Sequence, residues 1–242
     1  GIAGAGLFIL VQVLVIVVAR GGERLLTSVM PRPTAVLTAA LLASTMCVSM
    51  VVTGYRLIVR RIGRREAPEM DGPGALRELA AGLALGGALI CAVFAVLALA
   101  GAYRVTGVGW SEGVAVGLVF GVVGGSNEET MFRGFLQRLI ETRLGSWWAL
   151  GIISVVFGLL QLSNPQATLS GCLIIALTAA PLLGACYLLT RRLWLAIGVH
   201  ASWNFIQGGV FGSDVSGTGM IKRGLFEATF HGPDWLTGGH MG

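Results

Sequence analysis

Long apolar runs separated by short polar segments dominate the chain. The runs lie approximately at residues 2–19, 35–58, 79–102, 111–126, 148–162, 169–189 and 193–211. Most are close to the length of about 20 residues with which an α-helix crosses the hydrocarbon of a bilayer. The short alternating segments of a membrane β-barrel do not occur. The pattern therefore predicts an all-α fold, a polytopic transmembrane bundle of about seven helices.

Residues 128–145, between the fourth and fifth runs, mix charged with apolar side chains. The apolar positions, which recur every three or four residues, are Met131, Phe132, Phe135, Leu136, Leu139 and Ile140. This spacing places them on one face of a helix. It predicts an amphipathic helix that continues the fourth run.

Composition favours a membrane protein over a soluble domain. Apolar residues make up 55% of the chain and charged residues only 12%, against roughly a quarter charged in soluble domains. The net charge of +5 comes almost wholly from arginines between the apolar runs, which indicates orientation signals and no nucleic-acid face. Abundant arginine, alanine, glycine and valine favour a bacterial genome, so we expect a multi-pass protein of the bacterial cytoplasmic (inner) membrane.

The strongest basic cluster follows the second run and consists of Arg56, Arg60, Arg61, Arg64 and Arg65. By the positive-inside rule this loop is cytoplasmic. Counting runs from it puts Arg191 and Arg192 on the cytoplasmic side too. The arginines of residues 20–32 then fall outside, against the rule, and the residues after Phe211 are expected to be external.

Two adjacent glutamates, Glu128 and Glu129, follow the fourth run, and Arg133 lies four residues after Glu129. A carboxylate at membrane depth costs several kcal/mol unless it is paired or hydrated. Glu129 and Arg133 can pair on one helix face, which leaves Glu128 free to face a polar cavity. A desolvated glutamate can act as a general base toward water. Alternatively, both glutamates simply lie in the first turn of an amphipathic helix at the membrane interface, where negative charge is favourable.

His200 and Asn204 lie one helical turn apart in the seventh run. Their imidazole and carboxamide can aim two donors at one oxyanion or orient a water. They can equally form an interhelical hydrogen bond that only holds helices together.

The fifth run ends in a polar cluster, Gln161-Leu-Ser-Asn164-Pro165. Gln161 can donate through its amide, but it cannot take a proton or bind a metal as histidine does. A helix C-terminus with turn residues explains the cluster equally well.

Taken in order, the three segments around Glu128, Gln161 and His200 resemble the motifs of the CPBP family of intramembrane proteases. This family is also called the CAAX-protease, bacteriocin-processing or Abi family. The family's EExxxR motif is matched by Glu128-Glu129-Thr-Met-Phe-Arg133, and its HxxxN motif by His200-Ala-Ser-Trp-Asn204. The ordered set is far more specific than EExxxR alone.

The family's FxxxH motif, which lies between these two, reads Phe157-Gly-Leu-Leu-Gln161 here. The following Leu-Ser-Asn-Pro resembles the family's usual continuation, so the alignment holds and the histidine is replaced by glutamine. The resemblance covers the chain from about Val114 onward.

This resemblance implies a CAAX-protease-like bundle around a conical cavity that opens toward the cytoplasm. In the family's scheme Glu128 and the second-motif histidine activate a water, while His200 and Asn204 stabilise the oxyanion. The supporting residues are Glu129, Arg133, Phe157 and Gln161.

No cofactor is expected. Some descriptions treat the family as metalloproteases, but the glutamate-and-histidine scheme needs no metal. Since His200 is the only histidine at membrane depth, a three-ligand zinc site is hard to assemble, and a metal ion has weak support.

The leading hypothesis is an intramembrane endopeptidase that hydrolyses peptide or membrane-associated substrates by glutamate-activated water. Replacement of a histidine base typically costs about 100- to 10,000-fold in rate, so Gln161 also favours a catalytically silent family member, a binding or immunity protein. An ion-coupled transporter with Glu128 as its proton site is the third alternative. The expected partners are a peptide or membrane-protein substrate and the lipid bilayer, without nucleic acid. The sequence does not identify any partner subunit.

We divide the chain into N-terminal transmembrane helices (1–110), a CPBP/Abi-like catalytic core (111–212) and a Gly-rich tail (213–242). Because the chain begins at Gly1 and stops abruptly after Met241-Gly242, we expect residues to be missing at both ends.

Overall fold

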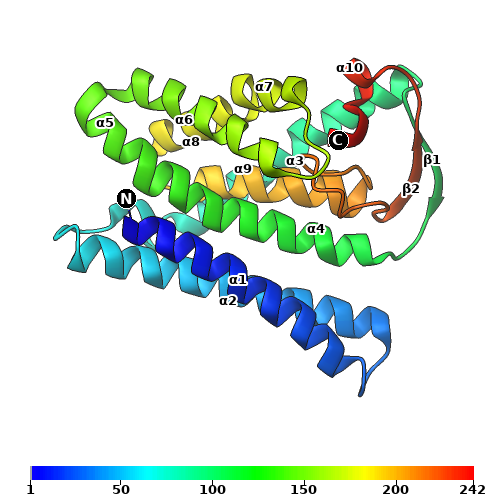
Figure 1. The fold of residues 1–242 in the computed structure, drawn as a ribbon, viewed down its shortest axis with the longest axis horizontal. Coiled ribbons are helices and arrows are strands. Elements are labelled where there is room, and N and C mark those ends of the chain that lie inside the picture. Colours follow the sequence, from blue (N-terminus) through cyan, green and yellow to red (C-terminus); the bar gives the residue numbers. More distant parts are fainter. Residues whose placement is uncertain (1) are drawn as a thin grey trace.

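The computed structural model describes residues 2–242 as a helical bundle with a small β-sheet (Figure 1). Helices α1 and α2 lie together on one side of the long run from α4 to α5, and α6, α7 and α8 lie on the other. The main elements are α1 (Ile2–Leu26), α2 (Arg32–Arg61), α3 (Ala75–Leu99), β1 (Tyr103–Val108), α4 (Glu112–Val123), η2 (Gly124–Glu128), η3 (Thr130–Gln137), α5 (Arg138–Leu144), α6 (Ser146–Leu160), α7 (Leu169–Leu177), α8 (Ala179–Thr190), α9 (Trp194–Asn204), η5 (Phe205–Val210), β2 (Phe226–Phe230) and α10 (Asp234–Thr237). Short 3₁₀ turns are η1 (Pro68–Met70), η4 (Gln161–Ser163) and η6 (Gly239–Met241).

Five helical segments within residues 2–242 are long and apolar enough to cross a membrane. They are Ile2–Leu26, Arg32–Arg61, Ala75–Leu99, Ser146–Ser163 and Leu169–Thr190. Large apolar side chains on their outer faces, such as Ile9, Leu85 and Leu173, are exposed, as expected for side chains that contact lipid. The predicted all-α polytopic membrane fold is confirmed.

The fourth apolar run and the amphipathic segment form one continuous helical run, from α4 through η2 and η3 into α5. The predicted continuation is confirmed, but wider π-helical turns replace the α-helix in η2 and η3. Such turns occur frequently at functional sites. The buried polar residues of this stretch are Ser126, Asn127, Glu129, Thr130, Arg133 and Gln137.

Glycines allow this run to approach α9 closely. A Cβ atom on Gly121 would lie 2.6 Å from the carbonyl oxygen of Ala201, and one on Gly125 would lie 2.7 Å from the carbonyl oxygen of Ile197. Side chains at these positions would push the two backbones apart. The close approach brings the polar residues of η2 and η3 within reach of α9.

The sixth apolar run is not one helix as expected, because it breaks at Thr178 between α7 and α8. Thr178 has φ −121° and ψ −77°, outside the helical region. Pro181 explains the break, since it has no N–H to donate to the carbonyl of Leu177 and its ring crowds that carbonyl. The two halves remain one membrane-crossing segment by length and hydropathy.

The Gly-rich tail folds back onto one end of the bundle. Strand β2 pairs antiparallel with β1, with Tyr103 opposite Phe230. Beyond β2, the amide of His231 donates to the carbonyl of Ala102 at 2.9 Å, and Met241 is buried. Although the tail is in contact with the core, the division of the chain into three parts stays a prediction.

We expect Gly121→Ala to destabilise the protein because its new methyl group meets the Ala201 carbonyl. Overpacking of this kind typically costs about 1–3 kcal/mol. Gly151→Ala in α6 is the matched control, since a Cβ there meets no atom within 4 Å. Thermal unfolding in detergent should show a lower Tm for Gly121→Ala alone. Equal melting of both variants would contradict the close packing of α4 on α9.

Candidate active site

A fully buried carboxylate, that of Glu129, lies at the centre of the polar interior. Its Oε1 accepts a hydrogen bond from Arg133 Nη1 at 3.0 Å and lies 2.7 Å from His200 Nδ1. The side chains of Glu129 and Arg133 are 0% exposed, so the ion pair must offset the desolvation of both charges. The expected pair of Glu129 with Arg133 is confirmed, and His200 is a third member that sequence reasoning did not connect to it.

Arg133 extends this network to two other helices. Its Nη2 donates to the carbonyl of Ala180 at 2.8 Å, in the first turn of α8. Its guanidinium carbon lies 4.9 Å from the centre of the Phe157 ring on α6, within the range of a cation–π contact. These contacts place Phe157, an expected supporting residue, directly against the ion pair.

Glu128 faces the other way and lines a cavity of about 710 Å³. The sequence-identified residues that line the same cavity are Phe157, Gln161, His200 and Asn204. Glu128 is partly exposed, whereas Glu129 is fully buried. The expected division between a paired Glu129 and a cavity-facing Glu128 is therefore confirmed.

His200 and Asn204 direct nitrogen atoms at the same space beside Gly124. A Cβ atom on Gly124 would lie 2.8 Å from Asn204 Nδ2 and 3.0 Å from His200 Nε2. Because glycine leaves this space free, an oxygen atom of a substrate or water can contact both nitrogens there. Sequence reasoning missed Gly124, and its adjacency to the EExxxR motif was the only available signal.

Gln161 takes the position of the expected second-motif histidine at the end of α6. Its Oε1 accepts a hydrogen bond from Asn164 Nδ2 at 3.0 Å, and the same Nδ2 lies 2.7 Å from the carbonyl oxygen of Ser216. The polar cluster is therefore both a helix end and a part of the cavity wall.

Apolar side chains and the tail complete the cavity. Val93 and Phe94 of α3 and Ile174 of α7 line it, as do residues 234–238 and 240–242 of the tail. Nothing in the periodicity of the tail indicated this contribution. The cavity thus lies toward the end of the bundle that β1, β2 and the tail cover.

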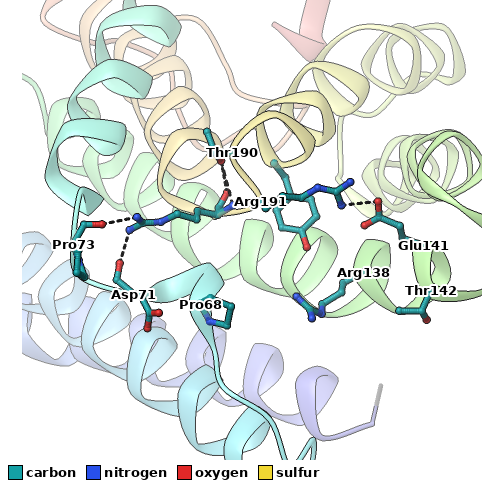
Figure 2. Close-up of a pocket in the computed structure, with 10 residues that line it drawn as sticks. Pro68, Asp71, Pro73, Arg138, Glu141, Thr142, Thr190 and Arg191 are labelled. Carbon is teal, nitrogen blue, oxygen red and sulfur yellow. Dashed lines mark hydrogen bonds and ion pairs between the residues drawn. The ribbon is translucent and has the colours of Figure 1, made fainter.

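Arg138, Arg191 and Arg192 lie at the opposite end, around a second cavity of about 620 Å³ (Figure 2). There Arg192 Nη2 donates to the carbonyl of Asp71 at 2.6 Å, and Arg191 Nη1 pairs with Glu141 at 2.6 Å. Arg192 also contacts the Pro73 carbonyl. The prediction that Arg191 and Arg192 share a side with the loop after the second apolar run is confirmed.

The cavity that contains Glu128 shares no lining residue with the cavity at the end of Arg191 and Arg192. Residues of the tail, which follows the pairing of β2 with β1, form part of its wall. The cytoplasmic opening that the family resemblance implies stays a prediction.

The side chains around Glu128 do not fit a resident metal ion. Among residues 2–242, no three His, Cys, Asp or Glu side chains lie close enough together to hold one. His200 directs Nδ1 at Glu129, and Glu129 is already shared with Arg133.

The Glu141 carboxyl at the basic end should make stability depend on pH. Burial alone would raise its pKa, but hydrogen bonds from Ser146 and Arg191 lower it. A lowered folded-state pKa means that the stabilisation is complete above the ordinary value of about 4.3 and disappears as the pH falls through the folded value. We expect wild type to exceed Glu141→Gln in stability near pH 7 by less than about 1 kcal/mol, since Arg191 is largely exposed.

Thermal unfolding from pH 7 to pH 3 tests this expectation. The Tm difference between wild type and Glu141→Gln should shrink toward zero at acid pH. A difference that stays constant would show that the ionised carboxylate is not what stabilises this corner.

One protein-family model matches the chain, that of the type II CAAX prenyl endopeptidase Rce1-like family, over residues 109–206. Comparisons with curated proteins and with solved structures found no match. The matched segment contains all three motif segments, from Glu128 to Asn204. The motifs, the helical membrane fold and this match together place residues 109–206 in the CAAX-protease (CPBP) family.

Proposed function

We propose that the protein is an intramembrane endopeptidase that hydrolyses peptide bonds of peptide or membrane-associated substrates with water activated by Glu128. One observation carries the proposal: a partly exposed carboxylate shares a cavity with two side-chain nitrogens that converge beside Gly124. Amide hydrolysis requires a base that activates water and polar groups that stabilise the oxyanion, and this cavity contains side chains of both kinds. Membership of an endopeptidase family supports the same reaction class.

In this mechanism a water between Glu128 and the scissile carbonyl gives its proton to the Glu128 carboxylate as it attacks the carbonyl carbon. His200 and Asn204 contact the reacting oxygens in the space beside Gly124. Collapse of the tetrahedral intermediate breaks the C–N bond, and Glu128 returns the proton to the leaving amine. A cavity enclosed by apolar walls strengthens these electrostatic contacts.

The supporting residues hold this geometry. The ion pair of Glu129 and Arg133 fixes the His200 ring through its Nδ1. Phe157 packs against Arg133, and its ring centre lies 6.1 Å from that of His200. Gln161 contributes a polar group to the cavity wall.

The substrate would meet this site within or beside the lipid bilayer, because the cavity lies among membrane-crossing helices. We infer the bacterial cytoplasmic membrane as the location from the arginine-, alanine- and glycine-rich composition. The charge pattern supports no nucleic-acid partner.

A second candidate function, favoured by Gln161, is a catalytically silent family member that binds a peptide or membrane segment in the same cavity. Glutamine cannot accept a proton from water as the expected histidine does. Cleavage by Gln161→His but not by the wild type would support this alternative.

We expect Glu128→Gln to lower kcat about 100- to 10,000-fold, because the amide keeps the shape of the carboxylate but cannot take a proton. The measurement is cleavage of a library of membrane-segment peptides in detergent, followed by mass spectrometry. Glu227→Gln on the exposed β2 strand is the matched control and should retain activity. Failure of the folded wild type to cleave any member would count against the endopeptidase.

We also expect Gly124→Ala to abolish most activity while the protein still folds. Its methyl group would fill the space between His200 Nε2 and Asn204 Nδ2, and loss of one oxyanion contact typically costs about 100- to 1,000-fold in kcat. Size-exclusion chromatography and Tm report folding, and the peptide assay reports activity. Retained activity would show that no reacting oxygen occupies this space.

A further inference from the structure

The hydrogen bonds around His200 determine which of its nitrogens can donate. Glu129 Oε1 accepts a hydrogen bond from Arg133 Nη1 at 3.0 Å, and a carboxylate oxygen that accepts from a guanidinium has no hydrogen to donate. His200 Nδ1, 2.7 Å from the same oxygen, is therefore the donor of this contact and carries a hydrogen. In the tautomer whose single N–H is at Nδ1, Nε2, which faces the space beside Gly124, is an acceptor.

A second chain of contacts determines the orientation of Gln161. The carbonyl oxygen of Ser216 can only accept, so the Asn164 atom 2.7 Å away is its NH₂ nitrogen. That nitrogen also lies 3.0 Å from Gln161, so the Gln161 atom that it contacts is the oxygen. Within residues 2–242 the Gln161 NH₂ group has no protein acceptor, and the side chain lines the cavity.

We propose that histidine and glutamine have exchanged roles in this site: His200 Nε2 accepts a hydrogen bond from the attacking water, and Gln161 donates to the oxyanion together with Asn204. Glu129 is the positioning residue that acts through His200. The assignment rests on the proposed endopeptidase function, and it gives that proposed hydrolysis a route that needs no histidine at position 161.

The proton and electron balance of the reaction is unchanged. The water forms the new C–O bond and transfers one proton to Glu128, while its other O–H points at His200 Nε2. The carbonyl electron pair moves onto oxygen, where the N–H groups of Asn204 and Gln161 stabilise it. When the C–N bond breaks, the proton held by Glu128 passes to the amine.

The histidine assignment is tested without reference to activity. Protein labelled with ¹⁵N-histidine and carrying His231→Gln and His240→Gln reports His200 alone by NMR. We expect a protonated Nδ1 and an unprotonated Nε2 near neutral pH, and loss of that preference in Glu129→Gln. A proton on Nε2 of the wild type, alone or with Nδ1, would overturn the assignment.

The glutamine assignment is tested with Gln161→Glu, which keeps the shape but replaces the donor by an acceptor. We expect kcat to fall about 100- to 1,000-fold with a smaller change in KM, whereas the exposed Gln166→Glu serves as the unaffected control. Unchanged or raised activity in Gln161→Glu would overturn the donor role. An inactive wild type would refute the endopeptidase itself, and the NMR result would still decide the state of His200.

Discussion

The arrangement of this core depends on the buried carboxylate of Glu129, because a charge at this depth needs partners. An unpaired charge at this depth would cost several kcal/mol, and the chain meets this cost with Arg133 from the same helical run and His200 from α9. His200 can reach Glu129 only because glycines let α9 approach the π-helical stretch. Nη2 of Arg133 then contacts Ala180 of α8, and its guanidinium contacts the ring of Phe157 of α6.

This network separates a buried, paired carboxylate from one that faces the cavity. Glu129 and Arg133 have no exposed side-chain surface, whereas Glu128, one residue away, lines the cavity. Adjacent residues on a helical turn point about 100° apart. Two neighbouring glutamates can therefore face two different environments, the buried ion pair and the cavity. Pairing one carboxylate leaves the other, the proposed general base, facing the cavity.

The two ends of the bundle carry different chemistry. At the end with Arg191 and Arg192, guanidinium groups contact carboxylates and backbone carbonyls and join the loop after α2 to the turn after α8 (Figure 2). At the other end, the β1–β2 pair and the tail form part of the cavity wall (Figure 1). The tail is therefore part of the wall of the candidate site.

Hydropathy and helical spacing were sufficient for the membrane bundle, the continuation of α4 into α5 and the pairing of Glu129 with Arg133, because these depend on neighbours within a few turns. The break at Thr178 also has a local cause in Pro181, although the unbroken apolar run concealed it. The contact of Glu129 with His200 spans 71 positions, and the cavity wall combines α3, α7 and the tail. No local pattern encodes such contacts, because they arise only when separate helices pack together and fix how far apart their backbones lie.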